Sequence, residues 1–278
     1  MKRIFALILG AVITAAALAS CGNSGSDTIT VVSREDGSGT RSAFVELMGI
    51  LQDDKDMTYE RAEISNSTSV VMSTVAGNAN AIGYISLGSL NDSVKAVNVD
   101  GVEATVDNIK SGSYKVSRPF NIATKDDLSD LAKDFISFIL STDGQAIVAE
   151  DYIALDATES YTPSGLTGKI TLAGSTSVSP LMEQLAAAYK ELNPDVTIEI
   201  QQSGSSAGIQ SAIEGVCDIG MASREIKEDE INAGLTPTVI ALDGIAVIVN
   251  NDNEVSDLTS EQIKNIYTGE VTSWSDVK

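Results

Sequence analysis

Three short segments rich in glycine and serine occur twice along this chain, always at the same distance. Gly37-Ser38-Gly39-Thr40 matches Gly174-Ser175-Thr176-Ser177, Ser67-Thr68-Ser69 matches Gly204-Ser205-Ser206, and Ile82-Gly83 matches Ile219-Gly220. The members of each pair are 137 residues apart. A repeated spacing of this kind predicts two halves that fold alike.

Each half predicts alternating strands and helices. Short apolar runs precede the Ser/Gly loops, and apolar residues at helical spacing follow them. The predicted strands cover 28–32, 61–64, 81–86, 169–173, 196–200 and 217–221, and the predicted helices cover 40–48, 69–75, 128–140, 178–189 and 207–214. Strands that alternate with helices favour parallel sheets covered on both faces, here in two α/β lobes.

Three further segments concern how the halves are joined. The apolar runs at 119–124 and 243–250 are either crossovers between the lobes or plain core strands. Residues 155–168 are rich in Pro, Gly, Ser and Thr and predict a linker.

The N-terminus indicates export. Lys2 and Arg3 precede an apolar run that is too short for a membrane-spanning helix. Leu18-Ala19-Ser20-Cys21 resembles the lipobox of bacterial lipoproteins, so residues 1–20 are a predicted signal peptide and 21–27 a tether. Acyl chains on Cys21, palmitate among them, would hold the protein on the outer face of the bacterial cell membrane. The alternative is an ordinary signal peptide with an incidental cysteine.

Composition argues against several classes of function. The chain has no histidine, which excludes triads that need an imidazole and removes the commonest metal ligand. Its formal net charge of −21 argues against a nucleic-acid partner. If Cys21 is lipidated, Cys217 has no partner for a disulfide, and it is most simply a small buried residue.

The Ser/Gly loops have the chemistry of an anion site. Each follows a strand and precedes a helix, where backbone N–H groups are unpaired and the helix dipole is positive. A single loop of this kind is better explained as a helix cap. Four loops in two repeated halves favour a shared anion site. Arg34, four residues before Ser38, adds a planar guanidinium that suits an oxyanion.

These segments also resemble a known family. The run from Ser33 to Arg41, SREDGSGTR, looks like the signature of phosphate-binding proteins that serve the high-affinity phosphate ABC importer. Residues 173–177, 204–208 and 218–225 are similar to the same family, and the resemblance covers essentially everything after Asp27. It implies a type II periplasmic-binding-protein-like α/β fold whose two lobes close on phosphate, with no cofactor and no metal.

The resemblance also implies phosphate contacts from both lobes. They are Thr176, Ser177, Ser205 and Ser223 on one side and Arg34, Ser38, Gly39 and Thr40 on the other. Asp36 would hold Arg34 in place. Ser223 stands where some family members carry an Asp that accepts the proton of hydrogen phosphate. Since a hydroxyl both donates and accepts, the usual reason for rejecting sulfate is weaker here.

The order of the segments departs from the family. The stretch with Thr176 and Ser205 normally comes first, so this chain resembles a circularly permuted member. The resemblance then predicts one lobe from 28–113 plus 242–278 and another from 114–241. Permutation is tolerated when the new ends lie in an exposed connection and the old ends lie close together. The rival arrangement is a domain-swapped dimer whose halves pair between chains.

The function implied is that of an extracytoplasmic receptor that delivers inorganic phosphate to the membrane permease of an ABC importer and is not an enzyme. Three alternatives stay open. They are a receptor for sulfate, molybdate or tungstate, a hydrolase that uses Ser38 as nucleophile, and an adhesin or sensor that binds no oxyanion.

Overall fold

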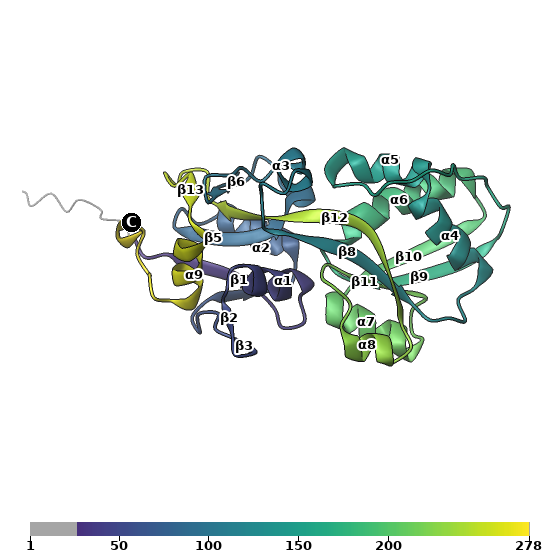
Figure 1. The fold of residues 1–278 in the computed structure, drawn as a ribbon, viewed down its shortest axis with the longest axis horizontal. Coiled ribbons are helices and arrows are strands. Elements are labelled where there is room, and N and C mark those ends of the chain that lie inside the picture. Colours follow the sequence, from purple (N-terminus) through teal and green to yellow (C-terminus); the bar gives the residue numbers. More distant parts are fainter. Residues whose placement is uncertain (1–26, 278) are drawn as a thin grey trace, which may run out of the picture.

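The computed structural model describes residues 27–277, which form two α/β lobes lying side by side (Figure 1). Two long strands, β8 (Ser117–Thr124) and β12 (Thr236–Val249), run from one lobe into the other. The predicted signal peptide and Cys21 lie outside the described residues. Within residues 27–277, no helix has the length and apolar character needed to cross a membrane.

The first half of the chain builds the predicted strand–helix–strand–helix–strand unit. Its elements are β1 (Thr30–Arg34), α1 (Gly39–Leu47), β4 (Glu63–Ser65), α2 (Thr68–Ala76) and β5 (Ala81–Ser86). β1 lies between β4 and β5 and pairs in parallel with both. We call the lobe that contains these strands the Arg34 lobe.

The second half repeats this unit. Its elements are β9 (Gly168–Gly174), α6 (Ser179–Leu192), β10 (Val196–Gln202), α7 (Ser205–Glu214) and β11 (Ile219–Ala222). β9 lies between β10 and β11 and again pairs in parallel with both. We call this lobe the Thr176 lobe. The predicted likeness of the two halves is confirmed.

Local chemistry places the helix starts at the ends of the strands. The hydroxyl groups of Ser38 and Ser67 cap α1 and α2 by accepting backbone N–H groups from the first turn. Gly204 begins α7 with φ at +85°, a conformation that residues with a Cβ rarely adopt. This turn brings Ser205 to the first position of the helix.

The sheets of the two lobes are continuous. The strand order is β10-β9-β11-β8-β12-β5-β1-β4, with β6 (Lys95–Ala96) also paired to β12. β8 is antiparallel to β11 and β12, and β12 is antiparallel to β5. The apolar runs at 119–124 and 243–250 therefore lie in strands that belong to the core and also connect the lobes.

The other elements lie around these two units. They are β2 (Leu51–Gln52), β3 (Lys55–Asp56), η1 (Leu87–Ser89), β7 (Asn98–Val99), α3 (Val106–Lys110), α4 (Asp130–Leu140), α5 (Thr142–Asp151), α8 (Glu228–Asn232), β13 (Asp257–Leu258), α9 (Ser260–Thr268) and η2 (Trp274–Asp276). The predicted linker at 155–168 has no regular structure before Gly168, where β9 begins.

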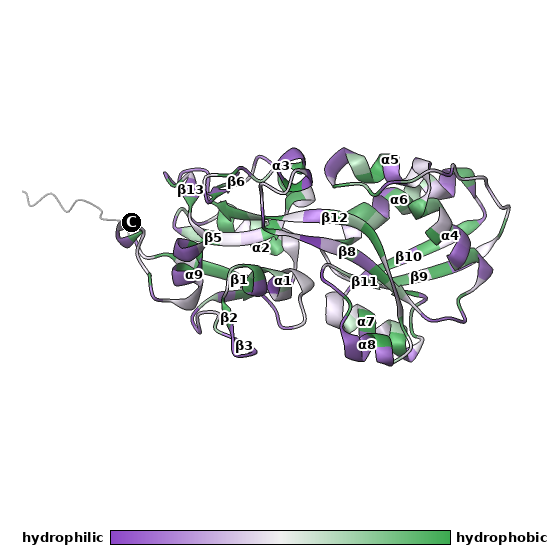
Figure 2. Cartoon of the chain, in the orientation of Figure 1, coloured by the Kyte–Doolittle hydropathy of each residue, from purple (hydrophilic) through white to green (hydrophobic). Residues whose placement is uncertain are grey.

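Each lobe has its own hydrophobic core. One cluster is centred on Phe44, Tyr84 and Tyr267, and the largest in the other lobe includes Phe135 and Tyr189. Figure 2 shows hydrophobic residues along strands such as β1 and β9 and hydrophilic residues on α8 at the periphery. The predicted lobe boundaries stay a prediction. Tyr114 and Val116, assigned above to the second lobe, pack in the core of the Arg34 lobe.

A buried ion pair joins the two connecting strands. Arg118 on β8 lies opposite Asp243 on β12, and their Nη2 and Oδ2 atoms are 3.1 Å apart. Both side chains are at most 2% exposed. Ser86 donates a further hydrogen bond to the Asp243 carboxylate. Burial raises the pKa of Asp243 to about 6, although Arg118 opposes the shift.

The two ends of the described chain lie side by side. Thr28 forms an antiparallel bridge with Ser273, and Ile29 donates to the carbonyl of Thr272. A connection between these ends would therefore span a short distance. The permuted segment order stays a prediction, and this proximity is the geometry that it requires.

Candidate functional site

Four Ser/Gly loops, two from each lobe, meet where the lobes face each other. They precede α1, α2, α6 and α7, so each presents the first turn of a helix at the carboxyl end of a strand. The predicted phosphate contacts of both lobes are buried there. Thr40, Ser177, Ser205 and Ser223 are all at most 1% exposed.

Arg34 reaches from the end of β1 across to the other lobe. Its Nη2 atom donates to Thr176 Oγ1 at 3.1 Å, and its Nη1 atom lies 3.5 Å from Thr68 Oγ1. Only 2% of Arg34 is exposed. One chain thus unites both halves of the predicted site, and a swapped second chain is not needed for it.

A cluster of hydroxyl groups lies beside this guanidinium. Thr40 Oγ1 is 2.9 Å from Ser177 Oγ and 3.4 Å from Ser223 Oγ. The backbone N–H of Gly39 donates to Ser205 Oγ at 3.2 Å. A Cβ on Gly39 would lie 2.5 Å from that oxygen, so a side chain at this position would hold the lobes apart.

The repeat is visible in this geometry. Thr40 and Ser177 are 137 residues apart and occupy equivalent positions in the two halves, yet their hydroxyls touch. Equivalent loops therefore face each other across the site. Each lobe supplies the same kind of donor group from the start of a helix.

One predicted role differs in the structure, and the side chain of another predicted residue serves as a helix cap. Asp36 does not hold Arg34: its carboxylate is 98% exposed and pairs with Arg41 at 3.0 Å. Glu35, whose side chain is longer by one methylene, turns back onto Arg34 and takes that role. Ser38 Oγ accepts the backbone N–H of Arg41 as the cap of α1, and the structure records no contact between this oxygen and the other predicted ligands.

Sequence reasoning missed two hydroxyls of the cluster. Thr68 Oγ1 lies 3.3 Å from Thr176 Oγ1 and 3.2 Å from Ser177 Oγ, and Ser175 donates to Ser223 Oγ at 2.9 Å. Both residues belong to Ser/Gly loops that the repeat had marked. Which hydroxyl of a loop faces the site depends on how the two lobes lie against each other, and that is a tertiary property.

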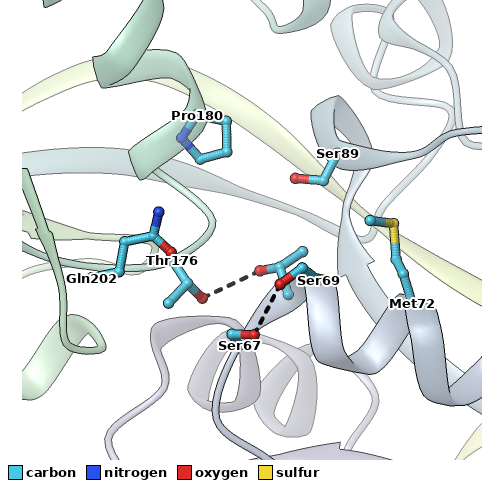
Figure 3. A pocket seen from close by; sticks show the side chains of 8 residues that line it. Ser67, Ser69, Met72, Ser89, Thr176, Pro180 and Gln202 are labelled. Atoms are coloured by element: carbon cyan, nitrogen blue, oxygen red, sulfur yellow. Dashed lines mark hydrogen bonds between the residues drawn. The ribbon is translucent and has the colours of Figure 1, made fainter.

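A pocket of about 280 Å³ opens directly outside Thr68 and Thr176. Figure 3 shows Thr176, Pro180 and Gln202 of the Thr176 lobe facing Ser67, Ser69, Met72 and Ser89 of the Arg34 lobe across it. Its lining contains no charged side chain. Thr68 and Thr176 therefore belong both to the hydroxyl cluster and to the lining of this pocket.

The arrangement suits a small oxyanion. It combines hydroxyl donors, backbone N–H groups and one arginine in a buried space, where such hydrogen bonds are stronger than in water. Among residues 27–277, no group of three or more His, Cys, Asp or Glu side chains is placed to hold a metal ion.

A family model and curated relatives match most of this chain. The PBP superfamily domain matches residues 13–143 and 159–278. Phosphate-binding protein PstS 2 of Streptococcus agalactiae is 54% identical over 271 residues, covering 94% of this chain and 92% of that protein. The chain belongs to the PBP superfamily. PstS 2 of Streptococcus pneumoniae is 51% identical over 274 residues, covering 94% of each protein.

A solved member of the superfamily has the same fold. The crystal structure of a phosphate-binding protein of a phosphate ABC transporter from Streptococcus pneumoniae matches with a TM-score of 0.72 and 52% identity. The match covers 90% of this chain and 100% of that one. The predicted two-lobed binding-protein fold is confirmed.

Proposed function

We propose that this protein is an extracytoplasmic receptor that binds inorganic phosphate between its two lobes and delivers it to an ABC importer. The observation that carries the proposal is that Arg34 of one lobe donates to Thr176 of the other, which belongs to a hydroxyl cluster that also contains Ser177. The relatives named above are phosphate-binding proteins and, in the solved case, part of a phosphate ABC transporter.

The ligand would bridge the lobes. The proposed phosphate contacts are Thr176, Ser177, Ser205 and Ser223 from the Thr176 lobe and Arg34, Ser38, Gly39 and Thr40 from the Arg34 lobe. Ser38, whose hydroxyl caps α1, would contribute through its backbone. Because phosphate would contact both lobes only when they are together, binding would stabilise the closed form, which docks on the permease.

The receptor is not an enzyme. The hydrolase alternative needs a base beside Ser38, and the Ser38 hydroxyl instead accepts the backbone N–H of Arg41. The relatives are named as binding proteins.

Selectivity between phosphate and other oxyanions distinguishes the proposed function from the alternative of a receptor for sulfate, molybdate or tungstate. The partners of Ser223 are the hydroxyls of Ser175, Ser205 and Thr40, and none of them is a carboxylate. Hydroxyls can accept a hydrogen bond from hydrogen phosphate and can equally donate one to sulfate.

Calorimetric titration of the signal-free protein, stripped of bound ligand, tests the ligand. We expect phosphate to bind with a micromolar or lower dissociation constant on both sides of its second ionisation. Sulfate, molybdate and tungstate carry no proton to donate to these hydroxyls at neutral pH, so they should bind at least about tenfold more weakly. Sulfate binding as tight as that of phosphate would favour the alternative receptor, and no binding of any oxyanion would contradict the proposal.

The anchor and the partner are also proposals. A lipid on Cys21 would keep the receptor at the outer face of the membrane beside its permease. We expect the full chain to stay with the membrane fraction of a bacterial host and Cys21→Ala to be released to the medium. A Cys21→Ala protein that stays on the membrane would contradict lipid anchoring.

A further inference from the structure

Glu35 binds one whole edge of the Arg34 guanidinium. Arg34 Nε donates to Glu35 Oε2 at 2.8 Å, and Arg34 Nη2 donates to Glu35 Oε1 at 2.9 Å. This is a two-point ion pair, the geometry in which an arginine is most strongly oriented by a carboxylate. The Glu35 side chain is 24% exposed, whereas that of Arg34 is 3% exposed.

The pair decides which edge of Arg34 faces the site. With Nε and Nη2 bound to Glu35, the edge formed by Nη1 and Nη2 points to Thr68 and Thr176 at 3.5 and 3.1 Å. The carbonyl of Ser65 accepts a second bond from Nε at 3.2 Å and holds the same orientation. Without Glu35, the guanidinium would keep only neutral partners among these groups.

Glu35 also lies against the second lobe. Its Oε1 atom is 3.3 Å from the place where a Cβ on Gly204 would be, next to the start of α7. A carboxylate at a helix N-terminus is favoured by the helix dipole. Asp36, the neighbouring acid, is 98% exposed and pairs with Arg41.

We propose that Glu35, and not Asp36, is the positioning residue that presents Arg34 to the bound anion in this protein. The proposal rests on the phosphate receptor function proposed above. Glu35 acts through Arg34 and makes no contact with the ligand. Without Glu35 the guanidinium could rotate. The anion would still meet the positive charge of Arg34, but the paired N–H donors would no longer be oriented toward it.

Phosphate affinity in matched variants tests this role. We expect Glu35→Ala to raise the dissociation constant by roughly tenfold or more and Glu35→Gln, which keeps the size and one acceptor, to raise it less. Asp36→Asn should change it less than about twofold, since it alters an exposed pair. Equal effects of Glu35→Ala and Asp36→Asn would overturn the proposal.

A double-mutant cycle separates positioning from general damage. In an Arg34→Ala background, Glu35→Ala should add less than about a twofold effect, because the group it positions is gone. A merely structural role would leave the full Glu35→Ala effect in that background, and this result would also overturn the proposal.

A readout without phosphate distinguishes this proposal from the receptor function. The Arg34 Nε–H signal in nitrogen-15 NMR spectra of the ligand-free protein, assigned by its loss in Arg34→Ala, should exchange slowly with water. We expect Glu35→Ala to accelerate this exchange and Asp36→Asn to leave it unchanged. Unchanged exchange in Glu35→Ala would refute positioning. If exchange were slow in the wild type and faster in Glu35→Ala, but the wild type bound no phosphate, only the receptor function would be refuted.

Discussion

Arg34→Ala is expected to weaken phosphate binding by about 3 kcal/mol, or roughly 100-fold. Arg34 is the charged donor that reaches from one lobe to Thr176 of the other, and it is buried. A buried anion that loses its charged partner keeps only neutral donors. Calorimetric titration of the ligand-stripped variant with phosphate measures the loss.

The matched control is Arg61→Ala, which removes an exposed arginine from the same lobe. It changes the net charge by the same amount, so it isolates the effect of contact from that of long-range charge. We expect an affinity within about twofold of the wild type, because salt screens exposed charges. Equal losses in the two variants would remove Arg34 from the site.

Arg118→Met is expected to lower the free energy of unfolding by about 3 kcal/mol near neutral pH. The reason is the Asp243 carboxylate, which would stay buried between the lobes without its charged partner. Urea denaturation of wild type and variant in the presence and absence of phosphate measures the change. Lys169→Met is the control, since the Lys169–Glu199 pair is about half exposed at both ends and should contribute less than about 1 kcal/mol.

The pH dependence of this loss follows from Asp243. Its pKa is about 6 in the folded protein, above the ordinary value of 3.8, so the folded state binds this proton more readily than the unfolded state. The contribution of Asp243 to stability is therefore present at low pH and is lost as the pH rises through about 6. In Arg118→Met the carboxyl is unpaired and should protonate even more readily. We expect the variant to lose less stability below about pH 5 than at neutral pH.

A double replacement separates the ion pair from simple packing. Arg118→Met combined with Asp243→Leu removes both buried charges, and replacing such a pair by apolar groups is often neutral or stabilising. We expect it to recover most of the stability lost in the single variant. A double variant as unstable as Arg118→Met would show that the loss comes from packing and not from the stranded charge.

The geometry of the connecting strands explains why this pair is unusual. Figure 2 shows hydrophilic residues on β8 and β12 where they cross between the lobes, whereas the strands within each lobe are largely apolar. Arg118 Nε and Nη1 are buried, and neither has a hydrogen-bond partner among residues 27–277. Two of the five buried side-chain polar atoms that lack a partner in the described part of the chain therefore belong to Arg118.

Much of the architecture could be predicted because it depends on short-range patterns. The repeat at Gly37 and Gly174 marks equivalent loops, and apolar spacing on either side marks the strands and helices. These patterns placed β1, α1, β9 and α6 within a few residues. Short elements such as the β2–β3 hairpin and α8 have too few residues for a periodic signal.

The sequence could predict which loops form the site, but not every side chain of those loops that faces it. Residue types and the family resemblance identified Arg34, Thr40 and Ser177 as candidates, and their side chains do meet in one cluster. That each of them contacts phosphate stays a proposal. Thr68 and Ser175 could not be singled out from the sequence, because Ser and Thr in a loop are as often helix caps as donors to a ligand.

The residue pattern alone specified two similar α/β halves whose Ser/Gly loops lie at the ends of strands, because hydrophobic period and turn chemistry are local properties. Only the folded chain decided that Glu35 rather than Asp36 holds Arg34, since two adjacent acids differ in reach and direction once the turn before α1 is formed. It also decided that Arg118 meets Asp243, 125 residues away. Long-range partners depend on how strands pair, and strand pairing is settled by burying both cores together.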